Sequence, residues 1–417
     1  MLQYLLTLYY FRFTKRERGV LMSLKQQIKI PIFSSTFIEN PYPFYDELRE
    51  ASPIYWLSSI THKGWFVTGY EEANKILKDK RFQIRKPLPR HTKDYTDLKN
   101  IQDHMMLYKN PPEHTKLRKL FQKPFSEQQI QKLQPVITQA VNDLLNEAEE
   151  NRKMDVIQDF AFPLPSLIIS ELLGIPKEDR IKIKKWTKDL LGVIDLTRTN
   201  ETLHTGNKIA KEVQQYFHNL IIERRHKPKN DLISAILGIQ ELTEDEKLST
   251  IILLMIAGHE TTVNLIANSI LTFLTNPIQL DLLKQNPSLI TSAIEECLRF
   301  ESPTQITARF ASETVKIGET EIKRGQQIYI VLGAANRDPK KFVNPHNFQI
   351  TRYPNPHLAF GSGIHYCLGS QLARLEAQIA VKEIFEKFPN LSLQEETIKW
   401  RKLIGFRALQ KLHVKLK

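Results

Sequence analysis

The spacing of apolar and polar positions predicts that the middle of the chain is almost wholly α-helical. Apolar side chains recur there at the spacing that gathers them on one face of a helix. A lysine-rich stretch around Ile181 shows the same amphipathic pattern. This spacing covers residues 43–50, 113–121, 127–150, 156–173, 201–225 and 368–388. A further predicted helix begins at Glu71.

One predicted helix differs from the others because it has no polar face in its early turns. Thr243 and Glu246 stand at the spacing of a capping box and mark its start. Residues 251–257 are then apolar on every side rather than along one stripe. Because a helix of this kind is buried all round, we expect a long central helix that runs through the core.

Short strands are predicted near the two ends of the chain, where β-branched and aromatic residues lie between turn residues. The predicted strands cover residues 54–57, 65–68, 314–317 and 327–332. Residues 85–110 contain Pro87 and Pro89 and scattered charge, which predicts a long irregular loop. A proline-rich meander is expected over 338–356, and the fold class is mainly α with a smaller β-rich portion.

The composition is that of a large globular protein, in one domain or several. Of the 417 residues, 41% are hydrophobic and 25% are charged, and Gly and Pro are modest in number. No apolar run reaches the ~18 residues that a membrane span needs. Low-complexity disorder, collagen-like repeats and a polytopic membrane protein are therefore excluded.

The net charge and the cysteine content indicate which classes of partner and which cellular compartment suit the protein. The 59 Lys and Arg exceed the 46 Asp and Glu, so the net charge is +13. Nucleic acid, an anionic membrane and an acidic protein would each suit this charge, but no nucleic-acid motif is present, so nucleic acid is the least supported. The two cysteines, Cys297 and Cys367, show no zinc-binding spacing and predict a reducing, cytoplasmic setting.

The N-terminal segment reads as an extension that precedes the domain. Met1 to Phe13 is apolar but too short to span a membrane, and it lacks the charge order of a secretory signal. An interfacial anchor is one interpretation. The favoured interpretation is that Arg16 to Gly19 is a translated ribosome-binding site and that Met22 is the native start. Residues 1–21 would then be a non-native extension and residues 22–417 the domain.

The most specific motif is a glycine-rich loop that leads one cysteine to the start of a helix. Phe360 to Gly369 fits the pattern F-G-x-G-x-H-x-C-x-G, which is expected by chance on the order of 10⁻⁵ times in a chain this long. Its glycines permit tight turns and close approach to a flat cofactor, and N–H groups at a helix start favour a thiolate. A buried structural cysteine is the alternative. With this motif the sequence resembles the cytochrome P450 family.

This resemblance implies a single-domain cytochrome P450 fold with haem b between the long central helix and the Cys-ligand loop. Cys367 would be the iron ligand. The E-x-x-R pair of Glu296 and Arg299, with Arg352 as a third partner, would form scaffold behind the haem. The residues expected to contact the cofactor are His114, Arg118, Ala257, Gly258, Arg309, Phe360, Gly361, His365 and Gly369.

A second family motif lies on the predicted central helix, in Ala257 to Thr262. By resemblance, Glu260 and Thr261 are the acid and the alcohol that pass protons during oxygen activation, a general-acid role. Thr261 could instead be a mid-helix threonine bonded to its own preceding turn. A zinc-protease H-E-x-x-H is excluded, because Val263 stands where its second histidine would be.

The sequence predicts an enzyme that depends on a separate electron donor, since it contains no dinucleotide-binding G-x-G-x-x-G and no cysteine cluster. Flavodoxin or ferredoxin would serve as the donor. Stretches outside the shared motifs, such as Ile194 to Arg198, resemble the P450s that cleave long acyl chains on acyl carrier protein to a pimeloyl unit for biotin biosynthesis. The alternatives are a hydroxylase of free fatty acids, macrolides or terpenes, a peroxide-driven enzyme, and a haem-binding sensor without turnover.

Overall fold

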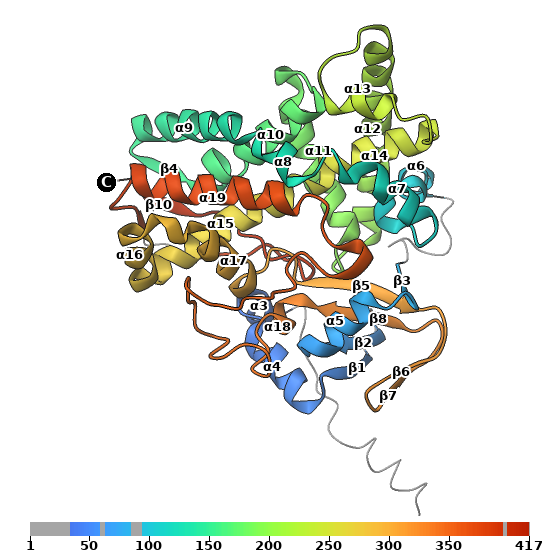
Figure 1. Cartoon of the computed structure of the whole chain (residues 1–417), viewed down its shortest axis with the longest axis vertical. Helices are drawn as coiled ribbons and strands as arrows, with labels where there is room; N and C mark the ends of the chain where they lie inside the picture. Colours follow the sequence, from blue (N-terminus) through green and yellow to red (C-terminus); the bar gives the residue numbers. More distant parts are fainter. Residues whose placement is uncertain (1–33, 59–62, 85–93, 395–397, 417) are drawn as a thin grey trace, which may run out of the picture.

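The computed structural model describes residues 34–58, 63–84, 94–394 and 398–416. A helical body forms one part of the molecule, and a sheet with a few short helices forms the other (Figure 1). The predicted fold class, mainly α with a smaller β-rich portion, is confirmed. The N-terminal extension that the sequence predicts over residues 1–21 lies outside the described residues.

Most predicted helices are present, with small shifts at their ends. The helices are α3 (Ser35–Glu39), α4 (Tyr42–Ala51), α5 (Tyr70–Lys78), α6 (Thr96–His104), α7 (Glu113–Gln122), α8 (Glu127–Gln131), α9 (Gln134–Asn151), α10 (Pro163–Leu173), α11 (Arg180–Ile194), α12 (Asn200–His226), α13 (Leu232–Leu237), α14 (Glu244–Ala257), α15 (Glu260–Thr275), α16 (Pro277–Gln285), α17 (Ile290–Phe300), α18 (Leu332–Ala335) and α19 (Ser370–Lys387).

Proline divides two segments that were predicted as single helices. Residues 127–150 form α8 and α9, and Pro135 occupies the first turn of α9. Residues 156–173 form a π-helix, Val156–Ala161, followed by α10, which begins at Pro163. Because proline has no N–H group, it is tolerated at a helix start but not in a helix interior. The apolar pattern continues across each break, so periodicity alone did not reveal it.

The predicted irregular loop over 85–110 was wrong for its described part. Residues 96–104 form α6, and Met106–Tyr108 form a 3-10 helix. Leu98 and Ile101 of α6 are buried, and α6 packs against α12 and α14. Tertiary burial stabilises this short helix, whose own charge-rich sequence has little helical periodicity.

The main sheet has five strands in the order β1-β2-β8-β5-β3. These are β1 (Ile54–Ser58), β2 (Lys63–Val67), β8 (Gln327–Val331), β5 (Ile306–Ala311) and β3 (Phe82–Gln83). Strand β2 runs parallel to β8, with Trp65 opposite Ile328, and the other pairs are antiparallel. Smaller sheets contain β4 (Lys153–Asp155), β10 (His413–Lys415) and β9 (Ser392–Leu393), and β6 (Val315–Ile317) and β7 (Thr320–Ile322).

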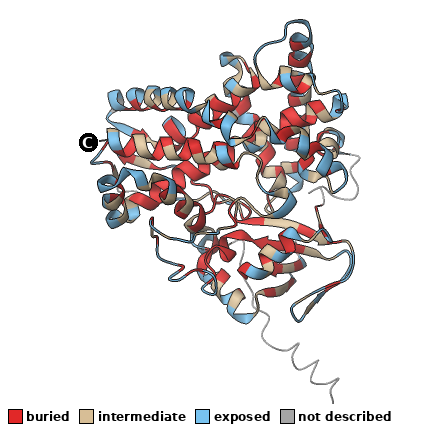
Figure 2. Cartoon of the chain, viewed as in Figure 1, coloured by how far each residue is buried: buried red, intermediate tan, exposed pale blue. Residues whose placement is uncertain are grey.

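Helices α14 and α15 lie in the buried centre of the helical body (Figure 2). Together they span the predicted central helix, and the capping box of Thr243 and Glu246 opens α14 as predicted. Two helical segments, Val156–Leu173 and Glu244–Thr275, are long and apolar enough to cross a membrane. The share of each that is buried inside the protein is 67% and 72%, as in the core helices of soluble proteins.

The E-x-x-R pair anchors the meander to α17. Arg299 donates hydrogen bonds to both carboxylate oxygens of Glu296, each 2.8 Å long, and both side chains are fully buried. Arg352 donates to the same carboxylate at 3.1 Å, which is the predicted third contact. A buried and bidentate network of this kind holds a loop in one position, here the segment that precedes the cysteine loop.

Candidate functional site

The glycine-rich loop folds into a set of tight turns that present Cys367 beside the start of α19. The backbone N–H of Cys367 donates to the carbonyl of Phe360 at 3.0 Å, and that of Gly361 donates to Leu358 at 2.8 Å. Gly361 and Gly363 both have φ of +73°, a conformation that favours glycine. A Cβ atom at Gly363 would lie 2.5 Å from the carbonyl oxygen of Leu77 in α5. Glycine therefore permits both the turn and its packing on α5.

The surroundings of Cys367 act on its thiol in opposite directions. Burial raises the pKa of the Cys367 thiol, whereas a hydrogen bond from the backbone of Gly369 and the charges of Arg118 and Arg374 lower it. Burial has the largest effect, so the pKa of the free Cys367 thiol lies above its ordinary value. The loop can supply a sulfur ligand, whose anionic form a bound metal would stabilise.

The predicted cationic residues converge beside this loop from three elements. His114 and Arg118 come from α7, Arg309 from β5 and His365 from the loop itself. The rings of His114 and His365 lie 4.1 Å apart. Burial, together with the nearby charges of Arg309, His114 and Arg118, lowers the pKa of His365 to about 3. Burial alone lowers the pKa of Arg309 to about 10.

This cluster fits a cofactor that carries carboxylates. Arg309 is 4% exposed, yet its guanidinium bonds only to Ala308 and Thr307 in the described part of the chain, at 2.8 and 3.3 Å. The buried Nδ1 of His114 has no hydrogen-bond partner among the described residues. A buried guanidinium such as that of Arg309 is costly unless an anion balances its charge. The carboxylates of a haem would provide that balance next to the Cys367 thiolate.

The helix ladder is interrupted between α14 and α15, within the motif Ala257 to Thr262. Helix α14 ends at Ala257, and α15 begins at Glu260. The Thr261 hydroxyl donates to the carbonyl of Ala257 at 3.1 Å. A Cβ at Gly258 would come within 3.0 Å of the Leu254 carbonyl oxygen, so glycine permits the backbone to pack closely here. The predicted central helix is therefore two helices, and the break leaves backbone groups and a hydroxyl next to each other.

Glu260 is buried and forms an ion pair with Arg401, which comes from the C-terminal segment. The Glu260 side chain is 4% exposed, and that of Arg401 is 23% exposed. The pair therefore extends from the interior to the surface at the start of α15. Glu260 also lies next to Thr261 in sequence.

Sequence reasoning missed a second ion pair close to the cysteine loop. Arg374 donates hydrogen bonds of 2.7 and 2.9 Å to Glu295, and His357 lies 3.1 Å from the same carboxylate. The guanidinium carbon of Arg374 lies 4.5 Å from the ring centroid of Phe360, an arrangement typical of a cation–π contact. The one available signal was spacing, since Arg374 follows Cys367 by two helical turns.

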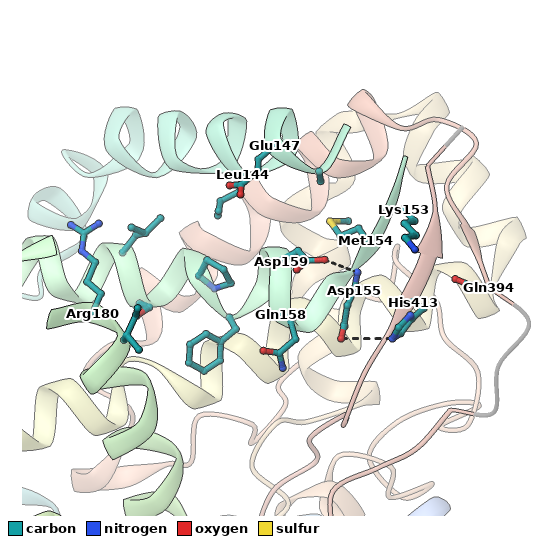
Figure 3. Close-up of a pocket in the computed structure, with 16 residues that line it drawn as sticks. Leu144, Glu147, Lys153, Met154, Asp155, Gln158, Asp159, Arg180, Gln394 and His413 are labelled. Atoms are coloured by element: carbon teal, nitrogen blue, oxygen red, sulfur yellow. Dashed lines mark hydrogen bonds and ion pairs between the residues drawn. The ribbon is translucent and has the colours of Figure 1, made fainter. Parts of the chain in front are cut away.

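A surface groove of about 710 Å³ lies away from these residues, between α9, α10 and the β4-β10-β9 sheet (Figure 3). Asp155, Asp159 and His413 line one end, and Arg180 lines the other (Figure 3). Asp159 accepts a hydrogen bond from the backbone of Asp155 at 2.8 Å. None of the predicted cofactor or catalytic residues lines this groove.

Comparisons with known proteins match one family over most of the chain. The profile of the family described as "Cytochrome P450" matches residues 29–414. The "Biotin biosynthesis cytochrome P450" of Bacillus subtilis (strain 168) is 51% identical over 91% of this chain and 97% of its own length. The polyketide biosynthesis cytochrome P450 PksS of the same organism is 39% identical over 91% and 96%.

A solved structure shows the same similarity at the level of the fold. The crystal structure of P450BioI in complex with hexadec-9Z-enoic acid ligated acyl carrier protein has a TM-score of 0.90 to this chain. It is 51% identical and is matched over 92% of this chain and 100% of its own.

Proposed function

This chain belongs to the cytochrome P450 family and is a haem-dependent monooxygenase, and from that premise we propose that its substrate is a long acyl chain carried by an acyl carrier protein. The product would be a pimeloyl unit for biotin biosynthesis, formed by oxidative cleavage of a carbon–carbon bond. The main support for this proposal is the 51% identity, over 97% of the relative's length, to a biotin biosynthesis P450. A relative solved with an acyl-loaded carrier protein supports the mode of presentation.

The residues around the cysteine loop would hold the cofactor. Cys367 would ligate the iron through sulfur, and His114, Arg118, Arg309 and His365 would bind the haem carboxylates. Phe360, Gly361 and Gly369 would lie against the macrocycle near the thiolate, and Ala257 and Gly258 would lie against it at the helix break. When bound, a haem with a thiolate ligand supplies the activation of O₂ by favouring O–O cleavage.

Thr261 and Glu260 would manage protons at the break between α14 and α15. The Thr261 hydroxyl, which donates to the Ala257 carbonyl in this structure, would be one proton donor at the site. Glu260 would take up protons from solvent at its contact with Arg401 and deliver them toward Thr261. The roles of both residues are part of this proposal.

Charge complementarity supports the choice of partners. Acyl carrier proteins, flavodoxins and ferredoxins are acidic, and the net charge of this chain is +13. Opposite charge accelerates and orients encounters between proteins. We therefore assign flavodoxin or ferredoxin as the external electron donor and place the enzyme in the cytoplasm, where these partners occur.

Mass spectrometry of the acyl group after turnover tests the proposed function. The enzyme would be given hexadecenoyl carrier protein, NADPH and a flavodoxin with its reductase, and a seven-carbon diacid on the carrier is expected. A hydroxylated but uncleaved chain would contradict the proposed cleavage and would indicate a hydroxylase of lipid-like molecules instead. Turnover with peroxide alone, or no turnover despite haem loading, would contradict a donor-dependent enzyme.

The salt dependence of binding tests carrier docking separately. The dissociation constant of the acyl carrier protein is expected to rise with ionic strength, because the Debye length falls from about 10 Å at 0.1 M to about 3 Å at 1 M. Free fatty acid of the same chain length is the control and should respond much less. Equal affinities for the free fatty acid and the acyl carrier protein at every salt concentration would contradict the proposal that the carrier protein docks on the enzyme.

A further inference from the structure

The turn between α11 and α12 is attached to the C-terminal segment by one buried carboxylate. Asp195 is 1% exposed and accepts hydrogen bonds from the backbone N–H groups of Gly405, at 2.8 Å, and Ile404, at 3.3 Å. It also accepts two from Thr197 in its own turn, at 2.7 and 2.8 Å. A Cβ at Gly405 would lie 2.9 Å from the Asp195 carboxylate, so glycine permits this contact. The carboxylate therefore fixes the turn in one position.

Arg198 is held by the same turn. Its backbone N–H and its guanidinium Nη1 both donate to the carbonyl of Asp195, at 3.3 and 3.2 Å. Within the described ranges, Arg198 forms no ion pair with a carboxylate. A half-buried guanidinium without a carboxylate partner keeps donors for an anion, because only part of its fork is used.

The charge of Arg198 acts on two tyrosines. Burial raises the pKa of Tyr108, in the 3-10 helix Met106–Tyr108, and the charge of Arg198 lowers it. The same two influences act on Tyr329 of β8. Phenol and guanidinium groups are hydrogen-bond donors, and together they suit an oxyanion.

Apolar side chains surround the same turn. Ile404, Ile306, Tyr329 and Phe66 belong to one buried cluster, and Leu196 packs against it. The Tyr329 and Phe66 rings are 4.9 Å apart. Arg198 therefore lies at the border of an apolar cluster.

We propose that Arg198, positioned by Asp195 and assisted by Tyr108, recognises the anionic oxygen group that terminates the acyl substrate. The group is either the carboxylate of a free fatty acid or the phosphodiester of the prosthetic arm of a carrier protein. This inference rests on the proposed acyl substrate and assigns the residue that distinguishes an anionic end from a neutral one.

Spectral titration of the haem enzyme with matched ligands tests the assignment. The ligands are palmitate, methyl palmitate and palmitoyl carrier protein, and the spin-state change of the haem gives each dissociation constant. For Arg198→Gln, the constants for palmitate, for the carrier conjugate or for both should rise about 10-fold, because a charge-assisted hydrogen bond is lost. Methyl palmitate should bind equally to both proteins. The ligand that responds identifies the source of the anion.

Three control variants separate recognition from folding. Arg198→Lys keeps the charge and should retain most of the affinity, whereas Arg225→Gln makes the same change at an exposed site paired with Glu244 and should have no effect. If Arg198→Gln fails to load haem, Tyr108→Phe serves instead, since it removes one donor and no charge.

The outcomes distinguish this inference from the function on which it rests. Unchanged constants for all three ligands in Arg198→Gln, or equal losses that include the methyl ester, would overturn the inference. Failure of the wild-type enzyme to bind any of the acyl ligands would overturn the proposed function itself.

Discussion

Glu260 at the start of α15 and Arg401 in the C-terminal segment form an ion pair across 141 positions of sequence. The carboxylate is almost fully buried, and the guanidinium reaches solvent. A buried carboxylate that loses the cation with which it pairs is strongly destabilised, because its charge then lacks this compensation. This pair therefore links the stability of the helix break to its proposed proton chemistry.

Arg401→Gln should lower the free energy of unfolding by about 1–3 kcal/mol, less than for a fully buried pair because Arg401 is partly exposed. Chemical denaturation of the haem-loaded protein measures the change. A double-mutant cycle with Glu260→Gln is the control, since the loss should largely disappear when the carboxylate is already neutral. Additive losses in the double variant would show that the two side chains do not interact.

Thr261→Ala should keep haem and substrate binding but divert reducing equivalents from product to peroxide or water. The reason is that the variant removes the hydroxyl proposed to deliver protons, while the backbone of the break remains. The ratio of product formed to NADPH consumed measures the effect. Thr261→Ser should restore coupling, and Thr262→Ala is a matched neighbour that should retain it. Unchanged coupling in Thr261→Ala would leave only a structural role for the residue.

Cys367→Ser should abolish the strongly red-shifted Soret band of the reduced, CO-bound protein. That band depends on a thiolate ligand to iron, and serine supplies no sulfur. The chain contains one other cysteine, Cys297, which is buried in α17. Cys297→Ala is therefore the control and should keep the band. A red-shifted band that survives in Cys367→Ser would show that another residue ligates the iron.

The local patterns that were predicted correctly share one property, which is that neighbouring residues determine them. The capping box of Thr243 and Glu246 formed as predicted, and Gly361 and Gly363 adopt the positive φ that a glycine-rich loop suggests. The E-x-x-R pair also lies within one helical turn. In each case, the spacing along the chain is enough to define the geometry.

The partners that were missed are brought together only by the fold. Arg401 and Arg374 look like ordinary surface cations in sequence, where most charged residues are solvated. Their partners, Glu260 and Glu295, lie 141 and 79 positions away. Helix α6 was missed for a related reason, since its stability comes from burial against α12 and α14 and not from its own periodicity.

A truncated chain that begins at Met22 should fold, load haem and remain soluble. The match to the cytochrome P450 profile begins at residue 29, which leaves the first 21 residues outside it. Their apolar run is short. Haem content, solubility and turnover of the truncated and full-length proteins are to be compared. Loss of haem or of turnover would show that residues 1–21 contribute to the domain.

The Glu295 cluster should make unfolding depend on pH in the acid range. Burial raises the pKa of Glu295, but hydrogen bonds from His357 and Arg374 outweigh burial and lower the pKa to about 2, from an ordinary value of 4.5. Because the folded pKa is the lower one, the stabilisation is fully present above about pH 4.5 and is lost as the pH falls toward 2.

Glu295→Gln should therefore lose stability at neutral pH and show a flatter decline between pH 4.5 and pH 2 than the wild type. Denaturation of the haem-loaded protein at a series of pH values measures both effects. Glu313, which is exposed near the β6–β7 hairpin, offers a matched control, and Glu313→Gln should leave the curve unchanged. Because Arg374 also contacts Phe360, the Soret band of Glu295→Gln should shift if the pair supports the cysteine loop. Parallel curves for Glu295→Gln and wild type would contradict the linkage between this carboxylate and folding.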